Sequence, residues 1–408
     1  MHYCCIFLLS LILSLSLISC DSSGVPIRPI NSENSESQTV ELRPVAAILN
    51  REEGTVGDTV VSPIGSSYEL HEAQFVDANN GWTRGRQVLY RTSNAGKDWK
   101  KLAPKLPIES YISSLFFIDR NYGWLTVVHQ AKAEKYGRGA YSSIMVTTDG
   151  GETWREQVIF RDEVRLRHLS FRDGNRGIAV GGKLIGNDQP YTEIFAVSTE
   201  DGGRTWKEIS KQVIPAIQTP HKFGNDFGSK IHWLSSSRVF LLTTGGRVVG
   251  SNDAGETWKP IVHFEDVRPE GWASSLGYYK LLFDTTGHLR LLAGGRGDEG
   301  YWGDLIVSDD RNHWQSYELR RVPLLDAMYL SETVVLACGQ QLNRDEKTNV
   351  PLPPDGIILL SKDNGKSWSP IYRTGTDETL ISLTRVNQTD FYAVSDMGSF
   401  IKFKLRIN

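Results

Sequence analysis

Short apolar runs alternate with turn-forming residues along most of the chain. Residues 88–90, 144–146, 305–307 and 357–360 are rich in branched apolar residues, and Asp, Asn and Gly follow each run within a few positions. Apolar runs of this length between turn signals are typical of β-strands. The composition agrees, because 38 Gly and 11 Trp accompany only 4 Met, a balance that favours turns and aromatic-rich strands. We therefore expect an all-β protein.

One polar phrase recurs six times: Ser or Thr, any residue, Asp or Asn, any residue, Gly, two residues, and Trp. The fifth copy is one residue short and lacks Gly. Successive Trp residues are 55, 52, 52, 56 and 54 positions apart, a period typical of the four-stranded blades of a β-propeller. The copies span residues 92–99, 147–154, 199–206, 251–258, 308–314 and 361–368.

The phrase has the chemistry of a hairpin turn. A short carboxylate accepts hydrogen bonds from turn N–H groups, and Gly supplies a position with positive φ. The Trp then starts the next strand and buries a large apolar area between blades. We expect structural roles for the polar positions Asn94, Asp149, Asp201, Asp253, Asp310 and Asp363, and for Trp99, Trp154, Trp206, Trp258, Trp314 and Trp368.

These copies resemble the Asp boxes, or bacterial neuraminidase repeats, of sialidases and many other proteins. A second phrase recurs at residues 75–82, 117–124 and 171–178, where Phe, Asp, Asn and Gly keep one spacing. Together the two phrases are similar to the photosystem II stability and assembly factor family of propellers. The resemblance extends loosely over residues 73–405 and implies the fold through scaffold residues, without supplying catalytic ones.

Opening strands can be placed at seven positions, one more than the number of boxes. The last blade lacks its own fourth strand, because residues 391–403 supply two strands and the chain stops at Asn408. We expect residues 59–64 to close the ring at its outer edge, where Pro63 is tolerated. The predicted domain is a seven-bladed propeller over residues 56–408. Its opening strands contain Phe75, Phe116, Leu169, Ile231, Leu281, Met328 and Leu383.

The N-terminal region follows another pattern. Residues 6–18 form an apolar run that is too short for a membrane-spanning helix. Residues 17–20 resemble the lipobox of bacterial lipoproteins, which implies a signal peptide over residues 1–19, a lipid on Cys20 and a place in the bacterial cell envelope, on the periplasmic side or at the cell surface. An ordinary secreted or uncleaved segment is the alternative. Residues 20–55 are polar and predict a flexible tether.

The charge, the cysteine content and the missing motifs limit which partners and which kinds of site we expect. The formal net charge of -3 gives no basic excess that would favour a nucleic-acid partner. Processing at Cys20 would leave only Cys338, within an apolar run, so we expect a buried thiol and no disulfide in the monomer. The sequence contains no His pair with metal-ligand spacing and no Gly-x-Ser-x-Gly phrase. We expect no cofactor and no metal.

Turns alternate between the two faces of a propeller. The box turns share one face, the box face, with the turns between first and second strands. Longer connections are predicted on the opposite, loop-rich face at residues 129–143, 182–193, 295–304 and 339–356, and between blades at 210–230 and 262–280. They carry aromatic and Arg residues, the types enriched at binding hot spots, although any single one can instead pin its loop to the blade. The candidate binding residues are Tyr136, Arg138, Tyr141, Tyr191, His221, Phe223, Phe227, Arg268, Trp272, Tyr279, Arg296, Tyr301 and Trp302.

Two functions remain open. A lipid-tethered scaffold would hold a protein partner on the loop-rich face, as an assembly factor or as an inhibitor of a toxic enzyme. A sialidase-like glycoside hydrolase, with a glycan ligand, would use carboxylates from different blades. The arginine triad and nucleophile pair of sialidases have no match in the sequence, so the first function is favoured.

Overall fold

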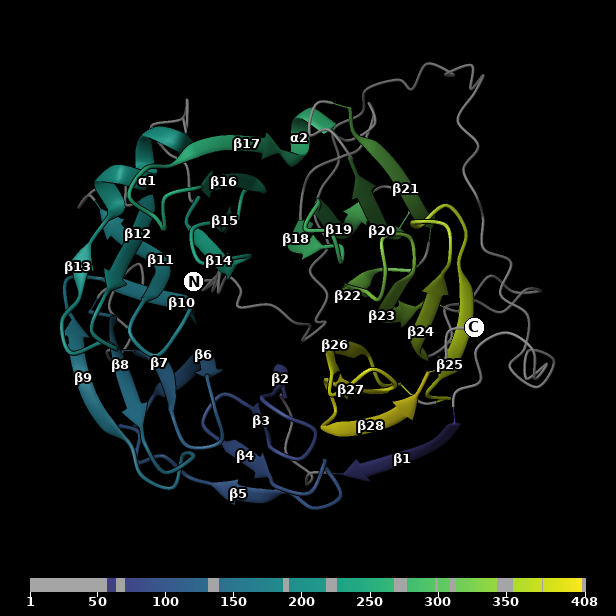
Figure 1. Ribbon diagram of the computed structural model, residues 1–408, viewed down its shortest axis with the longest axis horizontal. Helices are drawn as coiled ribbons and strands as arrows, with labels where there is room; N and C mark the ends of the chain where they lie inside the picture. Colours follow the sequence, from purple (N-terminus) through teal and green to yellow (C-terminus); the bar gives the residue numbers. More distant parts are fainter. Residues whose placement is uncertain are drawn as a thin grey trace, which may run out of the picture. The chain divides into compact units, whose positions relative to one another are not determined.

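The computed structural model describes residues 57–63, 70–130, 139–185, 191–217, 226–267, 277–297, 300–308, 313–320, 322–342, 355–375 and 377–405. All of them belong to one compact unit, Gln38–Asn408. Seven antiparallel four-stranded sheets follow one another around a central axis (Figure 1). The predicted seven-bladed propeller is confirmed. Among these described ranges, no helix is both long and apolar enough to cross a bilayer.

The first four blades follow one another along the chain, and in each the first strand lies nearest the axis (Figure 1). Blade 1 contains β2 (Glu72–Phe75), β3 (Gly81–Arg84), β4 (Leu89–Thr92) and β5 (Lys100–Leu102). Blade 2 contains β6 (Ser110–Phe117), β7 (Gly123–His129), β8 (Tyr141–Thr147) and β9 (Arg155–Phe160). Blade 3 contains β10 (Val164–Phe171), β11 (Gly177–Ile185), β12 (Tyr191–Thr199) and β13 (Lys207–Glu208), and blade 4 contains β14 (Gly228–Trp233), β15 (Val239–Thr243), β16 (Arg247–Ser251) and β17 (Lys259–His263).

The remaining three blades repeat this order until the last sheet, which takes its outer strand from the N-terminal part of the chain. Blade 5 contains β18 (Gly277–Phe283), β19 (Leu289–Gly297), β20 (Gly300–Val307) and β21 (Gln315–Arg320). Blade 6 contains β22 (Leu324–Tyr329), β23 (Val335–Gln341), β24 (Asp355–Ser361) and β25 (Ser369–Arg373). Blade 7 contains β26 (Leu380–Arg385), β27 (Asp390–Ser395), β28 (Ser399–Lys404) and β1 (Gly57–Pro63).

The ring closes as predicted. Strand β1 pairs antiparallel with β28, with Val61 opposite Ile401 and Pro63 opposite Ser399. Since β1 is the outermost strand of its sheet, Pro63 ends the ladder where its missing N–H costs little. This pairing removes the long free edge that β28 would otherwise present.

Two short helices, α1 (Ser210–Ile217) and α2 (Phe264–Val267), lie in connections where only loops were expected. Val213 and Ala216 of α1 are buried in the core cluster between blades 3 and 4. Pro215 lies inside α1, and a Pro in so short a segment hides the helical pattern from a reading of the sequence.

The second recurring phrase explains how blades pack. Phe117 ends the first strand of blade 2 and stacks on Trp82 of blade 1, with ring centroids 3.7 Å apart and planes 5° apart. The same Phe ring lies over Gly123 of its own hairpin, where an added Cβ would come within 2.4 Å of it. Phe, Gly and Trp therefore recur together because one ring contacts its own hairpin and the neighbouring blade.

Apolar side chains fill the spaces between sheets in clusters that run from blade to blade. Cys338 lies in one of them and is fully buried, as expected from its apolar run. Burial raises the pKa of its thiol well above the ordinary value, so the thiolate needed for nucleophilic chemistry is disfavoured.

Candidate functional site

The Asp-box turns are closed hydrogen-bonded units. In the second box the Thr147 hydroxyl donates to Asp149 Oδ1 at 2.8 Å and accepts from the Gly151 N–H at 2.9 Å. Asp149 Oδ1 also accepts from the Thr153 N–H at 2.9 Å. The boxes of Asp201, Asp253 and Asp363 repeat these bonds.

These bonds keep the carboxyl groups ionised. The backbone N–H and the hydroxyl of Thr205 lower the pKa of Asp201 to about 2, and the hydroxyls of Thr257 and Ser251 lower that of Asp253 to about 2. A carboxyl with so low a pKa is a poor proton donor near neutral pH. The box carboxylates hold turns, and their geometry gives no sign of acid–base chemistry.

The first box exchanges its polar groups. Asn94 stands at the usual carboxylate position and donates from Nδ2 to Asp98 Oδ2 at 2.8 Å, while its Oδ1 accepts from the Asp98 N–H at 3.0 Å. The carboxylate has therefore moved four residues along the same turn, and the hydrogen-bonded loop is preserved.

Blade 5 uses a different device beside its degenerate box. Asp310 lies outside the described residues, and Trp314 is half-buried. In the preceding hairpin turn, Arg290 is ion-paired with Asp284 at 2.8 Å and donates a second bond to the carbonyl of Ser308, the first residue of the box. A buried Arg thus braces the turn of the box that has lost its Gly.

The box Trp residues pack edge-on against the Phe rings described above. Trp154 meets Phe117 with centroids 6.0 Å apart and an interplanar angle of 79°, and Trp206 meets Phe171 at 6.0 Å and 85°. Such T-shaped pairs are favourable geometries for aromatic rings. Trp99 makes the equivalent contact in blade 1, and Trp258 and Trp368 are buried.

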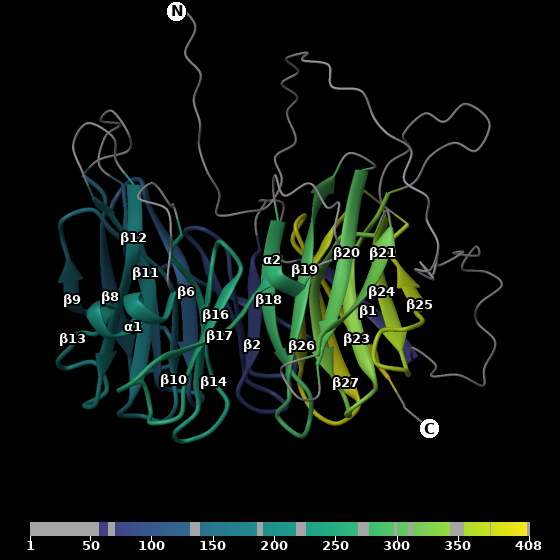
Figure 2. The ribbon, with the colours of Figure 1, turned by 90° about the horizontal axis from the view of Figure 1, so that it is seen from above.

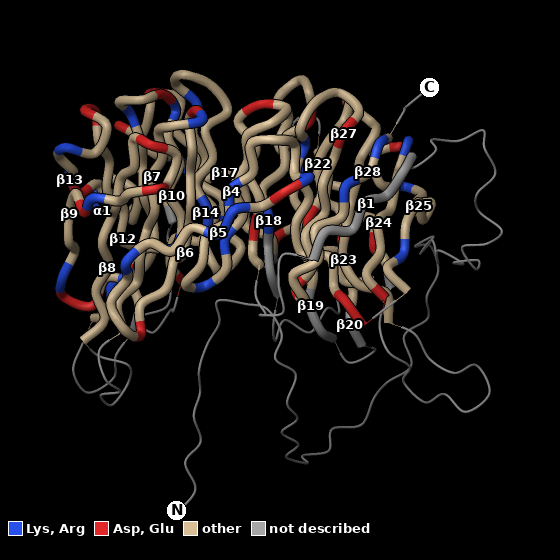
Figure 3. The backbone as a smooth tube through the Cα atoms, turned by 90° about the horizontal axis from the view of Figure 1, so that it is seen from below, with Lys and Arg blue, Asp and Glu red and all other residues tan. Residues whose placement is uncertain are grey.

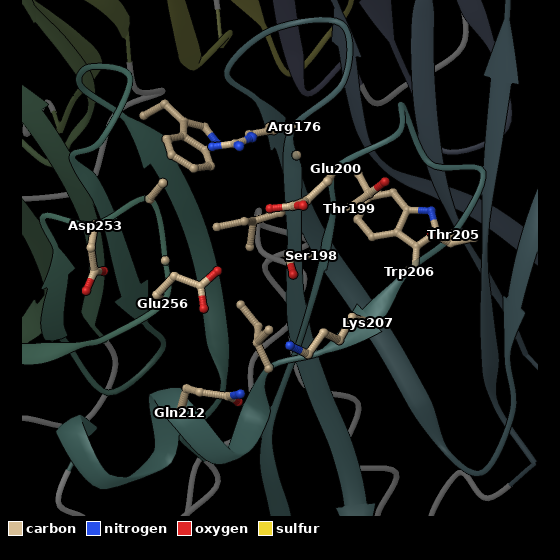
Figure 4. A pocket seen from close by; sticks show the side chains of 16 residues that line it. Arg176, Ser198, Thr199, Glu200, Thr205, Trp206, Lys207, Gln212, Asp253 and Glu256 are labelled. Carbon is tan, nitrogen blue, oxygen red and sulfur yellow. The ribbon is translucent and has the colours of Figure 1, made fainter.

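A pocket of about 500 Å³ lies between blades 3 and 4 on the box face. Its walls carry Trp206 and Trp233 together with Glu200 and Glu256 from two successive box turns (Figure 4). Lys207 adds a cation to the same pocket. No motif in the sequence predicts it, because it forms only where two box turns and α1 come together.

The loop-rich face contains only some of the predicted binding residues in described form. Tyr141, Phe227 and Trp302 are half-buried there. Tyr191, Tyr279, Arg296 and Tyr301 lie on strands β12, β18, β19 and β20. Tyr136, Arg138, His221, Phe223, Arg268 and Trp272 lie outside the described residues.

The prediction of a long loop over residues 295–304 is wrong. Strands β19 and β20 continue through this segment, so that Arg296 pairs with Tyr301 and Gly295 with Trp302. Tyr279 likewise lies within a paired strand, opposite Ala293. Four glycines between residues 294 and 300 made this segment look like a loop. Strand propensity depends on side chains, whereas the ladder itself is formed by backbone hydrogen bonds, which glycine can also make.

Arg side chains cover three aromatic rings on the loop-rich face. The Arg86 guanidinium lies 5.0 Å from the Tyr111 ring centroid, and Arg161 lies 5.8 Å from that of Tyr141. Arg167 lies 4.3 Å from the centroid of Phe227. All are cation–π distances. Four of these six residues are not predicted from the sequence because they lie in strands or in short turns, away from the long loops.

The two faces differ in their construction. Seen from the side, the sheets stand between them, and the described turns at the bottom of Figure 2 form a row of short, similar loops. Basic and acidic residues are interspersed over the described backbone (Figure 3). In the described part of the chain seen in this view, charges of both signs lie close together, so charge recognition there is local.

Polar residues form a ring around the central axis. Each occupies the third position before the end of the first strand of its blade, so the seven lie at equivalent levels. We call them the channel ring: Glu72, Ser114, His168, Lys230, Lys280, Asp326 and Ser382.

Side chains of the channel ring cap the free inner edges of the blades. The inner edge of a first strand has no partner within its sheet, so its N–H groups need other acceptors. The Leu115 N–H donates to Glu72 of the preceding blade at 3.3 Å, and the Leu169 N–H donates to Ser114 at 3.3 Å. The same relation joins Ile231 to His168 at 3.4 Å and Leu383 to Asp326 at 2.9 Å.

The carboxylates of the channel ring each have a cation. Glu72 is ion-paired with Arg84 at 2.7 Å, and Lys280 is ion-paired with Asp326. Burial opposes ionisation of Glu72, but the attraction of Arg84 and other cations outweighs it and lowers its pKa to about 2. Within the described ranges, no group of His, Cys, Asp and Glu has a metal-binding arrangement.

Comparison with known proteins agrees with this architecture. No family model matches the sequence. The photosystem II assembly protein Ycf48 of Thermosynechococcus vestitus is 27% identical over 308 residues, which cover 65% of this chain and 73% of that protein.

Solved structures extend the likeness at the level of the fold. A structure described as YCF48 bound to D1 peptide has a TM-score of 0.56 at 15% identity, covering 85% of this chain and 96% of its own. YCF48 from Cyanidioschyzon merolae has a TM-score of 0.55 at 15% identity, covering 85% and 98%. A GH74 xyloglucanase from Xanthomonas campestris has a TM-score of 0.54 at 14% identity, covering 84% and 53%, and shows shared fold alone. The chain is a Ycf48-like seven-bladed β-propeller, a distant homologue of the photosystem II assembly factor.

Proposed function

We propose that this chain is a membrane-tethered scaffold that holds a polypeptide partner on the loop-rich face of its propeller. The observation that carries the proposal is the set of Arg–aromatic pairs on that face, Arg86 with Tyr111, Arg161 with Tyr141 and Arg167 with Phe227. They come from successive positions around blades 1 to 4. Arg and aromatic side chains provide the area and directional contacts that dominate protein interfaces.

The architecture and the comparisons support this function. A closed propeller holds its loops on a rigid frame, which limits the ordering cost of binding. The solved YCF48 structure is described as bound to D1 peptide, so a related propeller binds a polypeptide. The box turns, by contrast, use their polar groups internally.

Paired substitutions on the two faces test the binding surface. Tyr141→Ala and Arg161→Ala alter the loop-rich face, and Tyr122→Ala and Arg120→Ala are matched controls in an exposed turn of the box face. The partner is captured from a membrane extract with the wild-type lipoprotein, identified, and titrated against each variant. We expect affinity to fall at least about tenfold for the first pair and to remain unchanged for the controls.

Equal loss on both faces would overturn the binding surface. Because Tyr141 also stacks on His129 with centroids 4.3 Å apart, each variant needs a melting curve that matches the wild type. Turnover of fluorogenic glycosides that disappears on Glu200→Gln or Glu256→Gln would instead favour a glycan-active enzyme centred on the pocket in Figure 4.

We further propose that a lipid on Cys20 anchors the scaffold in a bacterial cell envelope. Its support is the sequence of residues 17–20, which lie outside the described structure. Metabolic labelling with an alkyne fatty acid should mark the wild type and leave Cys20→Ser unlabelled, and the variant should leave the membrane fraction. A labelled Cys20→Ser variant would contradict the anchor.

A further inference from the structure

Among the charged members of the channel ring, Lys230 is the one that has no ion pair or hydrogen bond from its side chain to another described residue. Within the described part of the chain its ammonium group makes no hydrogen bond or ion pair. Burial and the positive charge of the neighbouring Lys280 lower the pKa of Lys230 to about 8. At pH 7 the group is still mostly protonated, and Glu72 and Asp326 attract its charge without forming an ion pair with it.

The charges of the channel ring show what is missing. Glu72 is balanced by Arg84 and Asp326 by Lys280. Burial lowers the pKa of His168 to about 3, so this ring residue is neutral at pH 7. Counted together with Arg84, the ring has three cations, Arg84, Lys230 and Lys280, for two carboxylates, which leaves an excess of one positive charge.

His168 supplies a second donor beside Lys230. Its Nδ1 accepts the N–H of Ile231, so the neutral imidazole carries its proton on Nε2. No acceptor for that N–H occurs among the described residues. An ammonium and an imidazole N–H thus lie at adjacent ring positions with unused donor capacity.

Solvent reaches part of the channel ring, although Ser114, Asp326 and Ser382 are buried. Lys230 and His168 are partly exposed, and the Lys280 side chain retains 22% of its accessible surface. Groups of several blades converge here, because Lys230 interacts electrostatically with Glu72 of blade 1 and Asp326 of blade 6. An anion held at this level would be attracted in surroundings that screen charge less than bulk water does.

We propose that Lys230 and His168 form a carboxylate-binding site in the central channel. A carboxylate carries the single negative charge that would balance this excess and presents two acceptor oxygens, one for each donor. The carboxylate belongs either to a small metabolite or to a polypeptide, as a chain end or an acidic side chain. The site uses other residues than the partner surface proposed above, with His168 next to Arg167 in β10.

Acetate is the first probe. The full chain is titrated with sodium acetate at pH 7, against sodium chloride at matched ionic strength, and binding is followed by melting temperature and by broadening of the ¹³C-acetate signal. We expect an acetate-specific rise in melting temperature and a loss of affinity of at least about tenfold in Lys230→Met. Lys259→Met, on the exposed outer strand β17, is the matched control and should bind as the wild type does.

Two further variants separate binding from folding. Lys230→Arg keeps the charge and should retain acetate binding. His168→Gln keeps an acceptor for Ile231 and an N–H donor and should retain it too, whereas His168→Leu should weaken it. Equal acetate responses in Lys230→Met and Lys259→Met, or identical responses of the wild type to acetate and chloride, would overturn the site.

A pair of peptides distinguishes the sources of the carboxylate. A short peptide without acidic side chains is prepared with a free C-terminus and as its amide, and each competes with labelled acetate. Competition by the acid alone supports a chain end as occupant, and acetate binding without peptide competition supports a small carboxylate. Because the acetate arm needs no protein partner, its failure is distinct from failure of the proposed scaffold function.

Discussion

Tyr392 of β27 stacks on Phe75 of β2 with ring centroids 4.9 Å apart and planes 3° apart. The pair joins the last blade to the first, in the place that Trp82 and Phe117 occupy between blades 1 and 2. The Tyr392 hydroxyl also donates to the carbonyl of Ala95 in the first box turn. The ring is therefore joined by a side-chain contact as well as by the β1–β28 ladder.

Truncating this contact should weaken the whole propeller. Tyr392→Ala should lower the free energy of unfolding by about 3–5 kcal/mol, since it removes a buried aromatic ring. Tyr392→Phe, which removes only the hydroxyl, should cost about 0.5–1.5 kcal/mol. Urea unfolding measures both, and equal effects would show that the hydrogen bond rather than the stack dominates.

Removing the closing strand should be more damaging. Deletion of residues 59–64, most of which lie in β1, exposes the edge of β28 and should lower the melting temperature sharply and promote association through that edge. Deleting residues 31–36 of the predicted tether is a length-matched control and should leave the melting curve unchanged. An unaltered melting curve after the first deletion would show that β1 is dispensable.

Adding a single methyl group to the Gly of the second phrase should destabilise the propeller. At Gly123 a Cβ would come within 2.4 Å of the Phe117 ring, which is held against Trp82. Gly123→Ala should therefore cost about 1–3 kcal/mol through overpacking. Gly174→Ala is the control, since a Cβ there meets nothing within 4 Å, and it should melt within about 1 °C of the wild type. Similar losses at both positions would assign the effect to glycine flexibility.

The box carboxylates should make the propeller sensitive to acid. The folded-state pKa of Asp201 is lowered to about 2 from 3.8, so the unfolded chain binds more protons between these values. Its stabilisation is complete above about pH 4 and is lost as pH falls toward 2. Asp201→Ala should lower the melting temperature at pH 7 and flatten its acid dependence, whereas Glu208→Ala, at an exposed position, should change neither. An unchanged acid profile in Asp201→Ala would contradict the linkage.

Lys230 should destabilise the empty propeller. Its folded-state pKa is lowered to about 8 from 10.5, so the cost of its charge is complete below pH 8 and disappears as pH rises to 10.5. Without added carboxylate, Lys230→Met should raise stability at pH 7 by about 1–3 kcal/mol, with the gain shrinking toward pH 10. A loss of stability at pH 7 would mean that the ammonium is compensated. The charged and titratable groups that interact with it are Glu72, His168, His232, Lys280 and Asp326.

The sequence predicts the repeating blades. It does not predict the channel ring, which forms where equivalent positions of the blades meet. The box period and the position of residues 59–64 are sufficient for seven blades and ring closure, because each box is a local turn that depends on its own hydrogen bonds. The channel ring was not foreseen. Its members lie at one level only in the folded ring of seven strands, and their residue types share polarity and nothing more specific.

Binding residues were harder to predict for a related reason. The long irregular segments predicted binding residues such as Trp272 and His221, which lie outside the described structure. Arg86 lies in the short turn between β3 and β4 and Arg167 in β10, and each becomes a candidate only through its contact with the ring of Tyr111 or Phe227. These contacts join residues that come together only in the tertiary structure, so no spacing along the sequence predicts them.

The β1–β28 pairing also sets the order in which the molecule can be completed. During synthesis β1 is made well before β28, because the strands of the first six blades lie between these two partners in the sequence. Six blades can form on the growing chain while β1 has no ladder to join, and such an unpaired strand is a natural target for chaperones. Closure of the ring therefore reports that β28 has been made, because a chain truncated before β28 leaves β1 without a ladder partner.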